Sequence, residues 1–146
     1  MGRIEKSIEI KAHPEKVWEM LALDRFDEWQ VGHMPTKNIK FKSEMHTPED
    51  KYRVGATAYS SDQPEIEFEI TESQENEKIT YRVKESNMKM DISAVLETVD
   101  EGTKMTYIID TELKSFLMRV VGKLFAGMGK SEMDKSIEKL KSILEK

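Results

Sequence analysis

The feature that most constrains this chain is a succession of segments in which apolar and polar residues alternate. In the clearest of them, the apolar residues Ile66, Phe68 and Ile70 alternate with three glutamates. A period of two residues is typical of a β-strand that buries one face and exposes the other. Similar runs occur at residues 3–10, 38–45, 54–61, 79–84, 88–96 and 105–113. Because short turns join most consecutive runs, the sequence predicts an antiparallel sheet built from hairpins.

Such a sheet needs a second layer over its apolar face. The only long segment left for this layer is residues 116–146, which have helical periodicity. Two shorter helical turns follow the first strand. One is capped by His13 and starts at Pro14, and the other starts at Asp24, a favourable cap. We therefore expect an α+β fold in which about six or seven strands form a curved antiparallel sheet around a long C-terminal helix.

The same alternation predicts which side chains face the interior. Eight apolar or aromatic residues share the inward parity: Ile66, Phe68, Ile70, Tyr81, Met90, Ile92, Met105 and Tyr107. The acidic partners Glu65, Glu67 and Glu69 should lie on the outer, solvated face. Lys6 is the one exception in the first run, because it shares its parity with three isoleucines.

The composition limits the classes of function. The 146 residues contain no cysteine, which excludes disulfides, thiolate metal sites and cysteine nucleophiles. The formal net charge is -5 and the charges are interspersed, which argues against a nucleic-acid surface. No apolar run reaches the ~18 residues that span a bilayer, so we expect no stable membrane insertion. The expected organisation is a single domain over residues 1–146 in a reducing, cytoplasmic compartment.

The C-terminal segment carries two apolar stripes that do not align. The first consists of Leu117, Val121, Leu124 and Met128, and the second of Met133, Ile137, Leu140 and Leu144. At ~100° per residue, the second stripe points roughly 150° away from the first. This slip predicts a break between Gly127 and Ser131; the alternative is a straight helix that exposes the first stripe. Residues 116–128 are apolar over most of the helix circumference, which is typical of deep burial or of a surface for a ligand, membrane or protein partner.

Several short motifs are spread over essentially the whole chain. They are Ile10-Lys11-Ala12-His13-Pro14-Glu15-Lys16-Val17-Trp18, then Leu21, Phe26 and Trp29, Gly55 opening a strand, Tyr81 in the middle strand, Gly102-Thr103 at the last hairpin, and Leu140-Lys141 near the end. On these motifs the chain resembles the START-like superfamily, also called the Bet v 1-like or helix-grip fold, and within it the polyketide cyclase/dehydrase and lipid-transport group. It departs from the common pattern after Trp29, where Gln30-Val31-Gly32 follow and many members have proline two residues later.

The resemblance implies a curved sheet that grips the last helix, with a cavity between them. It implies no shared catalytic motif, since members carry lipids, sterols, quinones, hormones or polyketides and others assist chaperones. Our leading hypothesis is binding or transport of an apolar small molecule or lipid, with no cofactor, no metal and no catalytic residue. The residues expected to line the cavity are Trp29, Phe68, Tyr81, Met90, Ile92, Met105, Tyr107, Val121, Leu124 and Met128.

Two other functions fit the sequence. A cyclase or dehydratase acting on a polyketide-like or aromatic substrate would use Tyr81, Tyr107 or His33 as acid or base. The two tyrosines could instead pack with one hydrogen bond each, or orient the polar end of a ligand. None of the three histidines has metal-ligand spacing. A protein-interaction module, such as a chaperone partner, would present an exposed apolar surface at residues 116–128.

Overall fold

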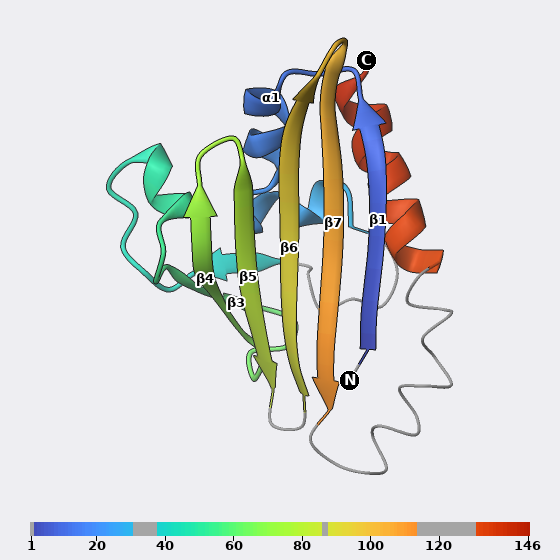
Figure 1. The fold of residues 1–146 in the computed structure, drawn as a ribbon. Helices are drawn as coiled ribbons and strands as arrows, with labels where there is room; N and C mark the ends of the chain where they lie inside the picture. The colour runs from blue at the N-terminus through green and yellow to red at the C-terminus, as the bar shows by residue number, and fades with distance from the viewer. Residues whose placement is uncertain (1, 31–37, 86–87, 114–130) are drawn as a thin grey trace.

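The computed structural model describes residues 2–30, 38–85, 88–113 and 131–146 (Figure 1). Within these ranges the chain forms one antiparallel sheet with the strand order β1-β7-β6-β5-β4-β3-β2. The strands are β1 (Gly2–Ile10), β2 (Ile39–Phe41), β3 (Thr57–Ser60), β4 (Glu67–Gln74), β5 (Lys78–Glu85), β6 (Met88–Val99) and β7 (Gly102–Leu113). Each strand after β2 pairs with the strand before it, whereas β1 pairs with β7. The predicted antiparallel sheet is confirmed.

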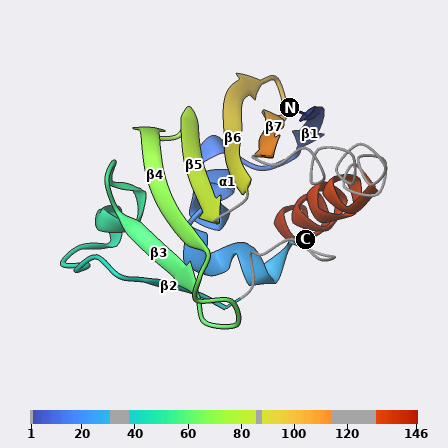
Figure 2. The same cartoon turned by 90° about the horizontal axis from the view of Figure 1, so that it is seen from below.

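The helical elements lie on the concave side of this sheet. Figure 2 shows the sheet curving around α1 (Pro14–Met20), the 3-10 helix η1 (Leu23–Glu28) and the C-terminal helix at residues 131–144. A second 3-10 helix, η2 (Pro48–Tyr52), lies between β2 and β3 in the sequence. This arrangement is the helix-grip fold that the sequence predicts.

The first short helix starts where the sequence predicts, and the second does not. His13 is the cap residue of α1 and Pro14 its first helical residue, as expected, although the His13 side chain makes no capping hydrogen bond. The second element begins one residue before Asp24, after an extended Ala22. The expected capping role of Asp24 is wrong, because its carboxylate accepts a hydrogen bond from Lys51 instead, at 2.7 Å.

The inward parity of the strands is confirmed. All eight residues predicted to face the interior are buried, with at most 6% of their surface exposed. Glu65 and Glu67 are exposed, and Glu69 is half-buried among the outer side chains. Hairpin pairing brings the inward residues opposite one another; for example, Tyr81 faces Ile92, and Ile92 faces Ile109. The concave face is therefore a continuous apolar surface.

The exception in the first run has a structural reason. The Lys6 ammonium lies 3.4 Å from Oδ1 of Asp134, on the C-terminal helix. Since Lys6 has the same parity as the buried Ile10, it extends toward the helix layer and not toward the outer face. A charged residue on the apolar side of β1 is thus part of the contact between the edge strand and the last helix.

The C-terminal helix uses the second apolar stripe for packing. Met133, Ile137 and Leu140 are buried, and Leu144 is half-buried against the core. The first stripe and the predicted break between Gly127 and Ser131 lie outside the described residues, so both stay predictions. No helix in the described part of the chain is long and apolar enough to cross a membrane.

Candidate functional site

An aromatic cluster forms the centre of the concave face. It joins Phe26 and the neighbouring Trp29 to Tyr81 on β5 and Tyr107 on β7. The Phe26 ring meets the Tyr81 ring edge-on, with centroids 5.2 Å apart, and Trp29 meets Tyr107 in the same way at 5.7 Å. Edge-to-face contacts at these distances are favourable beyond the burial of the rings. The cluster ties the segment after α1 to the middle of the sheet.

The polar atoms of these rings are bonded to the protein. The Tyr81 hydroxyl donates to the carbonyl of Leu21, and the Trp29 indole N–H donates to the carbonyl of Met20 at 2.9 Å. The Tyr107 hydroxyl accepts a hydrogen bond of 2.8 Å from the amide of Gln30. Burial raises the pKa of Tyr81 and of Tyr107 well above the ordinary value for a phenol. Both phenols are therefore neutral at physiological pH.

Seven of the ten predicted lining residues lie in the described part of the chain. Six of them are on the concave face of the sheet, and Trp29, which follows η1, packs against that face at Tyr107. Phe68, Met90, Ile92 and Met105 surround the cluster with apolar surface, and each is at most 6% exposed. Val121, Leu124 and Met128, as well as the candidate acid or base His33, lie outside the described residues. The structure thus brings together the sheet side of the predicted site.

The buried interior is poor in ionisable groups. Among the described residues, the buried polar or charged side chains are Gln30, Ser60, Thr103 and Ser136. Tyr81 and Tyr107 are the ionisable residues in the described buried core. The described residues contain no cluster of histidine, aspartate and glutamate that could hold a metal ion.

Sequence reasoning missed one polar residue of the cluster. Gln30 is only 5% exposed and its amide is bonded to Tyr107, 77 positions away. A glutamine in a predicted loop carries no periodic signal that marks it as buried. The one available signal was the departure from the family pattern after Trp29.

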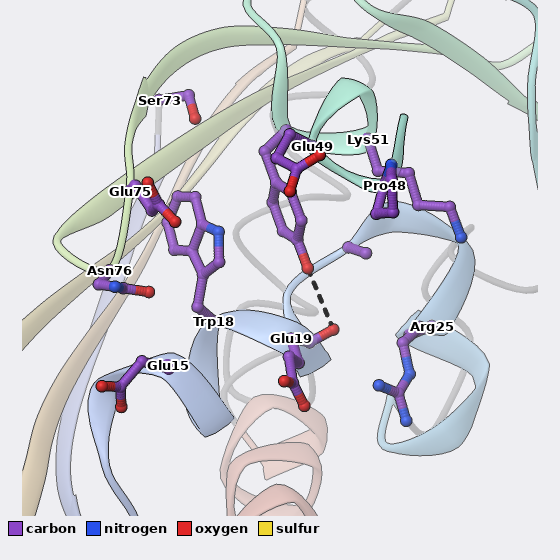
Figure 3. A pocket seen from close by; sticks show the side chains of 12 residues that line it. Glu15, Trp18, Glu19, Arg25, Pro48, Glu49, Lys51, Ser73, Glu75 and Asn76 are labelled. Atoms are coloured by element: carbon purple, nitrogen blue, oxygen red, sulfur yellow. Dashed lines mark hydrogen bonds between the residues drawn. The ribbon is translucent and has the colours of Figure 1, made fainter. Parts of the chain in front are cut away.

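A second feature is a hollow of about 600 Å³ at a different place (Figure 3). It lies between α1, the start of η1, the η2 segment and the β4–β5 turn. Its lining consists of Glu15, Trp18, Glu19, Ala22, Arg25, Pro48, Glu49, Lys51, Tyr52, Ser73, Glu75 and Asn76. The Trp18 and Tyr52 rings stack with centroids 4.9 Å apart and planes inclined by 22°. The Tyr52 hydroxyl donates a long hydrogen bond, 3.4 Å, to the carbonyl of Glu19.

The surroundings of this hollow are electronegative. Four of the lining residues are glutamates, and two are basic. The pKa of Tyr52 is raised to about 12, first by burial and then by the negative charge of Glu19. Sequence reasoning did not find this hollow, because no periodic pattern connects Trp18 with Tyr52.

Comparison with known proteins points to one family and one fold. The family model described as polyketide cyclase / dehydrase and lipid transport matches residues 1–145. A search of curated proteins found no match. Among solved structures, the chain is similar to the Aha1 dimer from Colwellia psychrerythraea, with 20% identity, a TM-score of 0.67 and coverage of 99% of this chain and 97% of that chain.

Two further solved structures are similar over nearly their full lengths. Protein MLL2253 from Mesorhizobium loti is 16% identical with a TM-score of 0.68, covering 98% of this chain and 96% of that chain. An uncharacterized protein from Rhizobium leguminosarum is 15% identical with a TM-score of 0.67, covering 99% and 94%. At such low identities the likeness concerns the fold.

Proposed function

The chain belongs to the polyketide cyclase / dehydrase and lipid transport family, within the START-like superfamily, and from that premise we propose that it binds or carries an apolar small molecule or lipid. The ligand would lie between the concave face of the sheet and the C-terminal segment, in the cytoplasm. The residues proposed to meet it are the ten named from the sequence, of which six lie on the described concave face and a seventh, Trp29, packs against it.

The observation that carries this proposal is the chemistry of the concave face. Most of its described side chains are apolar, and the Trp29 indole N–H, the Tyr81 hydroxyl and the Gln30 amide are already bonded within the protein. Such a surface offers a ligand apolar contact and few directional polar contacts. Burying ten methylenes of a ligand would contribute roughly 8 kcal/mol. Association entropy removes much of this, so we expect micromolar affinity and loose selectivity.

The same observation makes acid–base catalysis the weaker alternative. A general acid or base works best with a pKa near the operating pH. Burial moves the pKa of Tyr81 and Tyr107 away from that range, and the Tyr81 hydroxyl already donates a hydrogen bond to the carbonyl of Leu21. A cyclase or dehydratase using His33, and a protein partner at residues 116–128, both depend on residues outside the described ranges and stay hypotheses.

The proposal is tested by native mass spectrometry of the freshly purified protein, followed by thermal shift with a panel of fatty acids and flat aromatic compounds. A ligand that binds only the folded state raises the melting temperature by mass action. We expect such shifts at tens of micromolar, on the order of the affinity argued above. No co-purified lipid and no shift across the panel would contradict the proposal and favour the interaction module.

A pair of variants on one strand locates the site. Met90→Trp adds volume on the concave face of β6, whereas Lys89→Trp adds the same ring on the opposite face of the same strand. We expect Met90→Trp to weaken ligand binding by at least about tenfold and Lys89→Trp to leave it within about twofold. Equal effects of the two variants would place the ligand elsewhere.

A further inference from the structure

We propose that the hollow between α1, η1, η2 and the β4–β5 turn is a second binding site, distinct from the concave face, for a small organic cation with an aromatic or aliphatic body. Its volume of about 600 Å³ lies within the range of small-molecule sites. Three stretches of sequence, residues 15–25, 48–52 and 73–76, converge to form its walls. Figure 3 shows Glu15, Trp18, Glu75 and Asn76 on one side of the hollow and Arg25, Pro48 and Lys51 on the other.

The charge of the lining selects for a cation. Arg25 is held by Glu28 through two contacts, Nε to Oε2 at 2.7 Å and Nη2 to Oε1 at 3.2 Å. Lys51 is held by Asp24 at 2.7 Å. Neither Glu28 nor Asp24 belongs to the lining. Both basic side chains of the hollow are thus neutralised by acids outside it.

The four acidic side chains of the lining remain without such partners. They are Glu15, Glu19, Glu49 and Glu75, and none of them forms an ion pair in the described ranges. The hydrogen bond to Glu28 is the main cause that raises the pKa of the Arg25 guanidinium, and Glu19 adds to it only through its charge at longer range. All four are exposed to solvent. A cation in the hollow would therefore meet a net negative lining that salt can screen.

The aromatic wall selects for a cation with an apolar body. Trp18 is buried to 6% exposure, stacks on Tyr52, and supplies a rigid apolar surface together with Ala22. The Tyr52 ring is half-buried and lines the hollow. Ring faces attract cations, and the attraction grows where water is excluded. The pKa of Tyr52 is raised first by burial and then by the negative charge of Glu19, one of the acidic residues of the lining.

Three probes that share a phenyl ring but differ in charge test the proposal at pH 7. They are 2-phenylethylamine, which is a cation, 2-phenylethanol, which is neutral, and phenylacetate, which is an anion. The chain has two tryptophans, so a ¹⁵N-labelled sample has two indole N–H signals, and Trp18→Phe assigns them. We expect the amine to shift the Trp18 signal and leave the Trp29 signal in place. The alcohol should bind more weakly, and phenylacetate should not bind. Raising the salt concentration should weaken amine binding.

A matched pair of double variants separates a local site from a general effect of charge. Glu49→Gln with Glu75→Gln removes two carboxylates of the hollow, whereas Glu65→Gln with Glu67→Gln removes two exposed carboxylates that do not line it. We expect the first pair to weaken amine binding by about fivefold and the second by less than about twofold.

Several results would overturn the proposal. They are an unmoved Trp18 signal at millimolar amine, equal binding of the three probes, and equal effects of the two double variants. A lysine-rich peptide that binds more than about tenfold more tightly than the amine would replace the small cation with a basic protein partner. Because the readout is the Trp18 signal, the outcome does not depend on ligand binding at the concave face.

Discussion

Replacing Tyr81 with phenylalanine isolates one hydrogen bond that fixes the helical layer to the sheet. The Tyr81 side chain is fully buried, and its hydroxyl donates to the carbonyl of Leu21, which is also fully buried. Phenylalanine keeps the ring and its edge-on contact with Phe26 but leaves this carbonyl without the phenol donor. A buried acceptor that loses its donor costs about 1–3 kcal/mol. For a domain of this size, each kcal/mol lowers the melting temperature by about 2–4 °C.

The assay is thermal unfolding followed by circular dichroism, together with urea unfolding to check that the m-value is unchanged. Tyr59→Phe is the control, because the Tyr59 ring is half-buried and its hydroxyl makes no hydrogen bond within the described residues. We expect this control to change stability by less than about 0.5 kcal/mol. Unchanged stability in Tyr81→Phe would refute the role given to its hydroxyl. Ligand binding should be retained in Tyr81→Phe. If the Tyr81 phenol were catalytic, the variant would lose that activity, because it lacks the hydroxyl oxygen.

Three further predictions concern stability. Gly102→Ala places a Cβ against the carbonyl oxygen of Ile10, so β1 and the β6–β7 turn must separate. We expect the free energy of unfolding in urea to fall by about 3 kcal/mol, and a loss under about 1 kcal/mol would contradict this. The folded-state pKa of Tyr52 is about 12 and exceeds the ordinary value of 10.0, so the phenol ionises first in the unfolded chain. The free energy of unfolding therefore falls as the pH rises from 10 toward 12. Tyr52→Phe should make this fall with pH less steep. Lys6→Met removes the cation beside Asp134 and should lower the free energy of unfolding in urea by about 1 kcal/mol. In a double-mutant cycle, adding Asp134→Asn to Lys6→Met should restore part of that loss.

The sheet could be predicted from the sequence because burial in a strand has a period of two. That period placed Phe68, Tyr81 and Met105 inside without knowledge of their neighbours. Contacts without a period could not be found in the same way. Lys6 interrupted the apolar alternation of the first strand without an evident reason, because its partner, Asp134, lies at the other end of the chain.

The hollow escaped prediction for a related reason. Its aromatic wall pairs Trp18 of a helix with Tyr52 of η2, and only the folded chain brings the two segments together. The sequence also gave no signal that Arg25 and Lys51 would be held by acids outside the hollow. Long-range pairs of this kind decide the charge of a site, and a local pattern does not contain them.

The pairing of the first strand with the last has a consequence for how the chain is made. The strands from β3 to β7 pair with their neighbours in sequence, but β1 contacts β7 across separations such as the 99 positions between Ser7 and Thr106. Closing a loop of about 100 residues costs about 3 kcal/mol more entropy than closing a four-residue turn. During synthesis on a ribosome, the first strand to emerge is therefore the last to be paired. Until β7 has left the exit tunnel, both edges of β1 are unpaired and could join other nascent chains, whereas in the folded sheet only its outer edge is left.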